Sequence, residues 1–308
     1  MTENAPVVIT TKQARQQINH LGRSLIIYIV LFSLLQASGR LTELYASDAL
    51  ENVDTDMVTL VASIVFILFV TLIPFTISAK KLKLDIKDYL KDPRLRIDRT
   101  IALICIGIGL SLVVTSISTL FYFFFHTESI SYDWLGSFNT AENITKNILY
   151  FVFFVILEPL CDEYIFRGLI QRQLGHYGRY FGVIASAVLY AISRTNLVDA
   201  LPAFVVGWYL SLITLRYHSI RPGIKVHLAL SLFLWIVEII PGNMIWLITI
   251  FIVLIYIFAG LFIFQKRVDT GMVRYGATEG KLWKILLTSP TIIACIVLFV
   301  LNIMFSLV

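Results

Sequence analysis

The sequence predicts an all-α membrane protein, a polytopic transmembrane helical bundle with eight or nine spans. Of its 308 residues, 58% are hydrophobic and only 15% are charged, whereas about 25% are charged in ordinary soluble domains. The mean hydropathy is +0.82. A water-soluble domain of this length has no place to bury so much apolar surface. The composition therefore excludes a soluble globular protein, a disordered regulator and a disulfide-stabilised scaffold.

Nine segments approach the length of about 20 apolar residues that a helix needs to cross a bilayer. The first follows a polar, partly basic stretch, and no small-residue cleavage site follows it, so we expect an anchor rather than a signal peptide. The first, fifth, sixth and seventh segments are short or interrupted by polar residues. The alternative to nine spans is eight, with one short segment re-entrant. The predicted spans are 24–39, 57–79, 101–125, 146–172, 180–194, 201–215, 224–240, 244–264 and 287–307.

The cations lie almost entirely on one side of this arrangement. With the N-terminus inside, 22 of the 25 Lys and Arg residues fall in cytoplasmic segments, as the positive-inside rule requires. The other three are Arg40, Lys146 and Arg194, and the loop after the first span is acidic. The distribution predicts a plasma-membrane protein with its N-terminus inside and its C-terminus outside. It also explains the net charge of +5 by topology, so we expect no nucleic-acid partner.

The largest group of these cations lies at 80–99, KKLKLDIKDYLKDPRLRIDR. Cations, acids and leucines alternate there, which is compatible with an amphipathic helix on anionic lipid headgroups. An ordinary cytoplasmic loop explains the same residues equally well, so both alternatives stay open. The chain then divides into a cytoplasmic segment 1–23, N-terminal membrane helices 24–144, a core 145–240 and C-terminal membrane helices 241–308.

Ionisable residues inside spans are costly in a bilayer and therefore indicate functional positions. In the fourth span Glu158 and Asp162 are four residues apart, so they share a helix face. Glu163 and Arg167 repeat this spacing with the acid first, the favourable orientation for an ion pair. The span thus presents an acidic pair and a neutralised pair. Glu158, together with Glu238 near the outer end of the seventh span, is a candidate additional polar site.

Two further spans bring polar residues to the same level. Arg194 ends the fifth span, and the seventh carries His227 with Ser231 one turn further on. At about 1.5 Å per residue, Asp162 and Arg194 lie roughly 15 Å and 22 Å from the cytoplasmic ends of their spans. We therefore expect Asp162, Arg194 and His227 to share one polar cavity.

No motif in the sequence indicates a cofactor or a metal ion. A glycine-rich phosphate loop, a Walker signature, the HExxH motif and zinc-type Cys and His spacing are all absent. We therefore expect no cofactor and no metal, and no internal repeat of the kind that many transporters have is visible.

Three motifs within 145–240 resemble those of the CAAX protease and bacteriocin-processing family, also called the CPBP or Abi family. The family's Glu-Glu-x-x-x-Arg motif reads DEYIFR at 162–167, and its Phe-x-x-x-His motif reads YAISR at 190–194. The third motif begins Phe-x-x-Gly-x-x-x-Gly, which reads FVVG at 204–207 with Ser211 in the second glycine position. Members of the family resemble the type II CAAX prenyl endopeptidase, a membrane-embedded protease.

The resemblance implies catalytic roles for four positions. In the family, the first glutamate activates a water with help from the second-motif histidine, and a histidine and an asparagine stabilise the oxyanion. Here Asp162 replaces that glutamate and is one methylene shorter, while Arg194 replaces the histidine and cannot shuttle a proton. The third motif ends in HLALS, so His227 is retained and Ser231 replaces the asparagine.

The residues that the resemblance assigns to structure are retained. Glu163 and Arg167 complete the first motif, and Gly207 with the small residue at 211 permits close helix packing. An intact scaffold with altered chemistry is the pattern of a pseudoprotease.

Three functional hypotheses follow from the resemblance and these replacements. The first is a catalytically impaired scaffold or regulator in a bacterial plasma membrane of the Gram-positive type. Its partner would be a membrane protein such as a sensor kinase or a cell-envelope enzyme. The second is an active intramembrane endopeptidase with Glu158 or Asp162 as base, His227 as its partner and Arg194 as oxyanion donor. The third is a transporter, since buried charges also mark ion paths.

Overall fold

The computed structural model describes residues 11–45, 54–125, 135–194, 196–239 and 279–306, and over these residues every regular element is helical. The predicted all-α class is confirmed for this part of the chain. The elements, in which η1, η3 and η4 are π-helical and η2 is a 3-10 helix, are α1 (Thr11–Tyr45), α2 (Thr55–Phe66), η1 (Ile67–Thr71), α3 (Leu72–Lys81), η2 (Ile86–Leu90), α4 (Ile97–Phe125), α5 (Ala141–Tyr150), η3 (Phe151–Leu157), α6 (Glu158–Asp162), η4 (Glu163–Gln171), α7 (Arg172–Gly175), α8 (Arg179–Ile192), α9 (Leu197–Tyr217), α10 (Arg221–Ile239), α12 (Glu279–Leu287) and α13 (Pro290–Ser306).

Among the described residues, six helices are long and apolar enough to cross a membrane, and a bent pair adds a seventh. Two of the six are composite: Thr55–Lys81 joins α2, η1 and α3, and Ala141–Gly175 joins α5 to α7. The bent pair is Gly280–Leu287 with Pro290–Phe305, which turn by 67°. The protein is therefore an integral membrane protein with several apolar helices.

The predicted spans need two corrections. The segment 180–194 forms α8, which has 14 residues and is about 21 Å long, too short for a hydrocarbon core of about 30 Å. Residues 11–23, predicted to precede the first span as a cytoplasmic segment, are helical and continue without a break into it. The predicted span 244–264 lies outside the described residues.

The basic segment 80–99 is a loop and not an amphipathic helix. Between the end of α3 and the start of α4, only Ile86–Leu90 is helical. Pro93 disfavours helical backbone at the residue before it, so the 3-10 helix does not extend to α4. Ser219, in the turn between α9 and α10, donates a hydrogen bond to the backbone carbonyl of Tyr89 at 3.1 Å. The loop is thus fastened to the end of the bundle.

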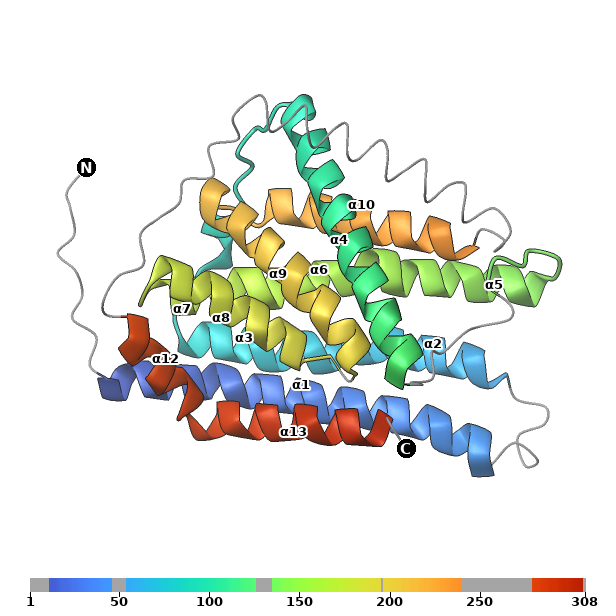
Figure 1. Cartoon of the computed structure of the whole chain (residues 1–308), viewed down its shortest axis with the longest axis horizontal. Helices are drawn as coiled ribbons and strands as arrows, with labels where there is room; N and C mark the ends of the chain where they lie inside the picture. The colour runs from blue at the N-terminus through green and yellow to red at the C-terminus, as the bar shows by residue number, and fades with distance from the viewer. Residues whose placement is uncertain (1–10, 46–53, 126–134, 195, 240–278, 307–308) are drawn as a thin grey trace.

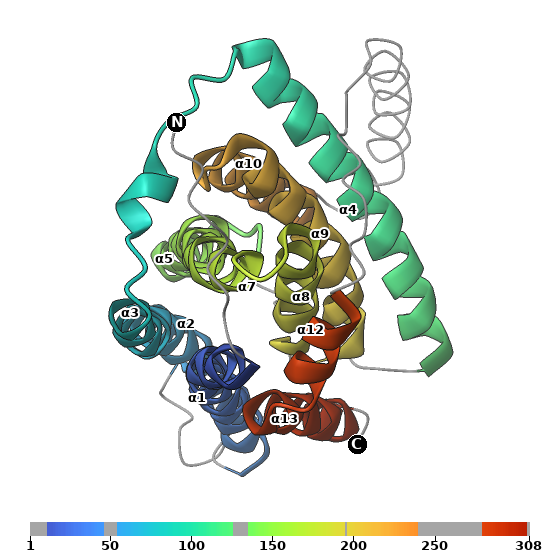
Figure 2. The same cartoon turned by 90° about the vertical axis from the view of Figure 1, so that its left-hand side faces the viewer.

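Figure 1 shows α1, the α2–α3 helix, the α5–α7 helix and α13 running roughly along the long axis, with α4, α8 and α9 inclined to it. In the end view of Figure 2, α8 and α9 lie side by side and α4 lies outside α9. The largest buried cluster joins α1, η4, α8 and α13 through residues such as Leu25, Phe166 and Cys295. Large apolar side chains such as Val113 remain exposed, as lipid-facing side chains do.

The close approach of α7 and α8 depends on Gly182. A β-carbon at this position would lie 2.6 Å from Gly175 N and 2.9 Å from Gln171 O, and these backbone atoms cannot move aside as a side chain can. We expect Gly182→Ala to lower the free energy of unfolding by about 1–3 kcal/mol, measured by unfolding in bicelles. Gly168→Ala is the matched control, because its β-carbon would meet no atom closer than 3.6 Å. An equal loss of unfolding free energy in Gly182→Ala and Gly168→Ala would contradict this explanation.

Candidate functional site

The candidate site lies on the composite helix Ala141–Gly175, where the backbone departs from regular α geometry. α6 carries Glu158 and Asp162, and the π-helical segments η3 and η4 flank it. Pro159 favours this departure, because it has no N–H for the bond to residue 155 and its ring crowds that carbonyl. Short π-helical turns within α-helices are frequent at functional sites. The change in helix geometry coincides with the charged residues.

Glu158, Asp162 and Arg194 form an ion-paired group, which we name the Arg194 cluster. Arg194 Nη1 lies 2.6 Å from Glu158 Oε1, and Nη2 lies 2.7 Å from Asp162 Oδ2. The Asp162 side chain is 3% exposed, and those of Glu158 and Arg194 are each 17% exposed. The contact between Asp162 and Arg194 that their depths suggested is present, and the guanidinium is held between two carboxylates.

Glu163, Arg167 and His227 form a second group, the Glu163 cluster. Glu163 Oε1 lies 3.1 Å from Arg167 Nη1 and 3.1 Å from His227 Nδ1. His227 Nδ1 and Glu163 Oε1 are thus within hydrogen-bond distance. The Glu163 and Arg167 side chains are completely buried. Arg167 Nη2 also donates a hydrogen bond to Gly207 O at 3.0 Å, which links the cluster to α9.

The expectation of one cavity shared by Asp162, Arg194 and His227 is wrong in one respect: His227 pairs with Glu163. Asp162 and Glu163 are consecutive residues of a helix, so their side chains leave it about 100° apart. Asp162 consequently contacts Arg194 just beyond the end of α8, and Glu163 contacts His227 on α10. The structure contains two clusters on different faces of the helix, and His227 belongs to the Glu163 cluster.

Of the two residues expected to form an additional polar site, only Glu158 lies in these clusters. Glu238 follows His227 by eleven residues, which is roughly 16 Å along α10. Its carboxylate accepts a hydrogen bond from the Tyr150 hydroxyl at 3.0 Å. Ser231 is half-buried on α10, one turn beyond His227.

Tyr190 connects the two clusters, although it was not among the site residues predicted from the sequence. Its hydroxyl donates to Asp162 Oδ2 at 2.8 Å. Its ring has Arg194 Cζ at 4.6 Å and Arg167 Cζ at 4.7 Å from the centroid, distances at which a cation is attracted to an aromatic face. The available signal was a tyrosine where the family's second motif has phenylalanine, since the substitution adds a hydroxyl.

Gly207 lets α9 pass close to both Tyr190 and Arg167. A β-carbon on Gly207 would lie 2.8 Å from Tyr190 Cδ1 and 3.2 Å from Arg167 Nη2. Four residues further along α9, Ser211 is fully buried, and its carbonyl accepts a hydrogen bond from Gln171 Nε2 at 2.8 Å. Both small residues thus lie where α9 meets the helix that carries the clusters.

The two clusters hold carboxylate and guanidinium groups inside the bundle in fixed positions relative to one another. Within the described ranges, no three or more His, Cys, Asp and Glu side chains are arranged to hold a metal ion. The Arg194 cluster has two carboxylates for one guanidinium, and in the Glu163 cluster one carboxylate lies between a guanidinium and an imidazole. These contacts bind the side chains to each other, and they hold the His227 imidazole against the Glu163 carboxylate.

The fold and the site define a class of protein: a helical membrane protein with buried carboxylate–arginine clusters on adjoining helices. Residues 144–233 match the family model described as type II CAAX prenyl endopeptidase Rce1-like, and both clusters lie within them. This part of the chain is similar to an Rce1-like domain of the CPBP family, a family of membrane endopeptidases. The match covers less than a third of the chain. The comparisons with curated proteins and with solved structures gave no match.

Proposed function

We propose that the protein is a catalytically impaired CPBP-family member that acts as a scaffold or regulator of a membrane-protein partner. The observation that carries this proposal is the contact of Arg194 with Asp162 at 2.7 Å. Arg194 stands at the position of the family's second-motif histidine, and Asp162 at that of its catalytic glutamate. A guanidinium stays protonated, so it neither accepts nor relays the proton that this reaction must move.

The contacts of Asp162 also oppose its use as a general base. Its Oδ2 atom accepts hydrogen bonds from the Tyr190 hydroxyl at 2.8 Å and from Arg194 Nη2 at 2.7 Å. A water activated at this oxygen would have to displace one of these donors. Aspartate is also one methylene shorter than glutamate, and a misplacement of about 1 Å costs about 10²-fold in rate.

The parts of the domain that support packing are intact, which favours a binding role. The Glu163 cluster is buried, and Gly207 permits the close approach of α9. These contacts hold the helices together whether or not a peptide bond is cut. A domain that keeps its packing contacts and lacks a proton relay is suited to binding another membrane protein through its spans and loops.

The two other hypotheses have weaker support. An active endopeptidase would use Arg194 as an oxyanion donor, but both of its terminal nitrogens already pair with carboxylates. His227 pairs with Glu163 and not with Glu158 or Asp162, the candidate bases. A transporter would use buried charges as an ion path, whereas the buried charges of the site pair with one another.

We expect the purified protein in liposomes not to cleave prenylated CAAX-type peptides. The matched variant is Glu158→Gln/Asp162→Asn/Arg194→Gln, which removes the three charges and replaces both acids with amides of similar shape. Mass spectrometry of the peptides is the measurement, and an active member of the family in identical liposomes is the positive control. Neither the wild type nor the triple variant should form product above background. Product that the wild type forms and the triple variant does not would overturn the proposal.

Affinity capture from native membranes tests the binding half of the proposal. Because no catalytic step is involved, the same specific partner is expected with the wild type and with the triple variant. Gly207→Val, which forces α9 away from Tyr190, is expected to lose the partner. Thermal unfolding of each purified variant separates loss of binding from loss of the fold. A folded triple variant without the partner would contradict the proposal.

A further inference from the structure

A pocket separate from both clusters lies at the end of the bundle that faces the viewer in Figure 2. There the composite helix Ala141–Gly175 ends, α8 begins and α9 ends. The pocket has a volume of about 120 Å³, room for about four waters at about 30 Å³ each. No residue of the Arg194 cluster or the Glu163 cluster lines it. A group of about five heavy atoms therefore fits here without disturbing the candidate site.

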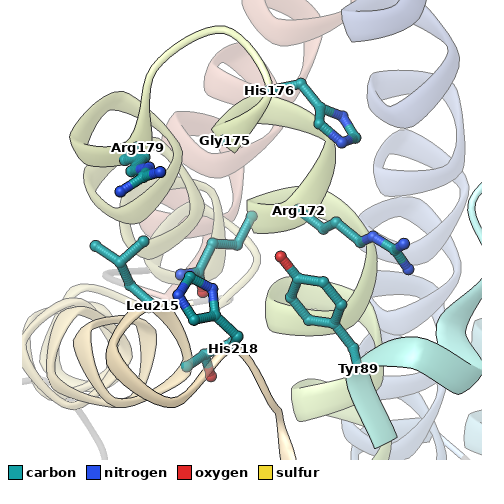
Figure 3. Close-up of a pocket in the computed structure, with 9 residues that line it drawn as sticks. Tyr89, Arg172, Gly175, His176, Arg179, Leu215 and His218 are labelled. Atoms are coloured by element: carbon teal, nitrogen blue, oxygen red, sulfur yellow. The ribbon is translucent and has the colours of Figure 1, made fainter. Parts of the chain in front are cut away.

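The lining of this pocket is basic. It includes Arg172, His176, Arg179 and His218, and none of the described residues that line it is acidic (Figure 3). The guanidinium of Arg172 stacks on the Tyr89 ring at 4.5 Å from the centroid. Figure 3 shows the Tyr89 hydroxyl directed into the space between Arg172 and His218. Partial burial and the nearby Arg172 lower the pKa of His176, which agrees with a positive local field.

The first turn of α8 adds to this field. Its N-cap is Gly178, which has no side chain to accept hydrogen bonds from the first backbone N–H groups of the helix. The N-terminus of a helix carries a partial positive charge and favours anions. Arg179, the first residue of α8, lines the pocket. The basic side chains and the dipole of α8 thus both favour an anion in the pocket.

Two buried polar atoms in the lining have no hydrogen-bond partner among the described residues: Gln171 Oε1 and Thr214 Oγ1. Gln171 is 6% exposed and Thr214 is 1% exposed. Gln171 Nε2 donates to Ser211 O at 2.8 Å, so Oε1 is left as an acceptor, whereas the Thr214 hydroxyl can donate. Buried polar groups are normally satisfied. Neither atom has accessible surface, so the groups that the pocket offers to a ligand are its basic side chains.

His218 is placed on the pocket wall by an uncommon backbone conformation. It ends α9 in the left-handed region with φ at 49°. Glycine or asparagine is the residue that this conformation favours at the end of a helix. A histidine here presents an imidazole donor to the pocket that either of those residues would lack.

We propose that this pocket binds a phosphate group. The phosphate oxygens accept hydrogen bonds from Arg179 and His218. Inorganic phosphate has this chemistry, and so does the phosphomonoester headgroup of phosphatidic acid. Both sources can reach the pocket, since two candidate membrane spans end beside it. This site is independent of the proposed scaffold role.

The experiment uses the full chain in nanodiscs and has two arms. In the first, inorganic phosphate is titrated by calorimetry into protein in neutral phosphatidylcholine nanodiscs. In the second, nanodiscs contain a minor fraction of phosphatidic acid or of phosphatidylglycerol, and native mass spectrometry counts the retained lipid. Phosphatidylglycerol is a phosphodiester whose phosphate is not terminal, so it is the control for lipid charge. Binding in the first arm assigns the site to free phosphate, and preferential retention of phosphatidic acid assigns it to the lipid.

Variants locate the binding within the pocket. Arg179→Gln and His218→Gly are each expected to weaken binding about tenfold, the loss typical for a charge-assisted hydrogen bond. Arg216→Gln is the matched control, because Arg216 is exposed, belongs to the last turn of α9 and does not line the pocket. An equal loss with Arg216→Gln, equal retention of the two anionic lipids or no binding in either arm would overturn the proposal.

Discussion

Replacing Arg167 with methionine is expected to lower the free energy of unfolding by about 3–5 kcal/mol. Arg167 and Glu163 are both 0% exposed and 3.1 Å apart, so the substitution leaves the carboxylate buried with only His227 beside it. Methionine keeps most of the side-chain length, so the loss reports on charge rather than on a cavity. Steric trapping in bicelles measures the free energy of unfolding of a membrane protein.

Two further variants test this explanation. Glu163→Gln/Arg167→Met removes both charges and is expected to recover much of the stability, because buried pairs are often replaced without large loss. Arg96→Met is the control, because its side chain is 79% exposed and its pair with Asp98 at 3.3 Å is screened by water. A loss of less than about 1 kcal/mol is expected there. If the double variant were no more stable than Arg167→Met, the uncompensated charge would not be the cause.

Arg194→Met is expected to cost about 3 kcal/mol, the lower end of the range for a broken buried pair. Its side chain is 17% exposed, so water screens the charge in part. The substitution leaves Glu158 and Asp162 without the cation that lies between them. The two negative charges then repel each other. Unfolding in bicelles is again the measurement.

The origin of the Arg194 effect can be isolated by a mutant cycle. In a Glu158→Gln/Asp162→Asn background the carboxylates are neutral amides of similar shape, so Arg194→Met is expected to cost less than about 1 kcal/mol. The difference between the two backgrounds is the coupling between the guanidinium and the two acids. Equal losses in both backgrounds would show that Arg194 stabilises the fold by packing alone.

The helical class and most of the spans could be predicted from the sequence because apolar runs report directly on contact with lipid. The ends of helices were predicted less well. The polar stretch 11–23 is helical although it is not apolar, since hydropathy marks the apolar part of a helix and not a polar extension of it. For 180–194, the apolar pattern did not reveal that the helix ends at Ile192, which leaves it nearly two turns too short to span.

The site was predicted in part for a similar reason. Helical spacing alone paired Glu163 with Arg167, and estimated depth brought Arg194 to Asp162. Spacing says nothing about which neighbouring helix each face meets, so His227 was assigned to Asp162 and is found against Glu163. Tyr190 was missed because its importance comes from lying between two arginines that are 27 residues apart in the chain.

The sequence by itself determined that this chain is a helical membrane protein, that charged residues interrupt its central spans and that its motifs resemble the CPBP family. Composition, periodicity and spacing are local properties, and these conclusions need nothing more. Only the tertiary structure decided that the charges form two separate clusters, that Glu238 belongs to neither, and that a basic pocket forms where α7, α8 and α9 meet. Each of these depends on the direction in which one helix faces another, and that direction is set by packing between segments far apart in the chain.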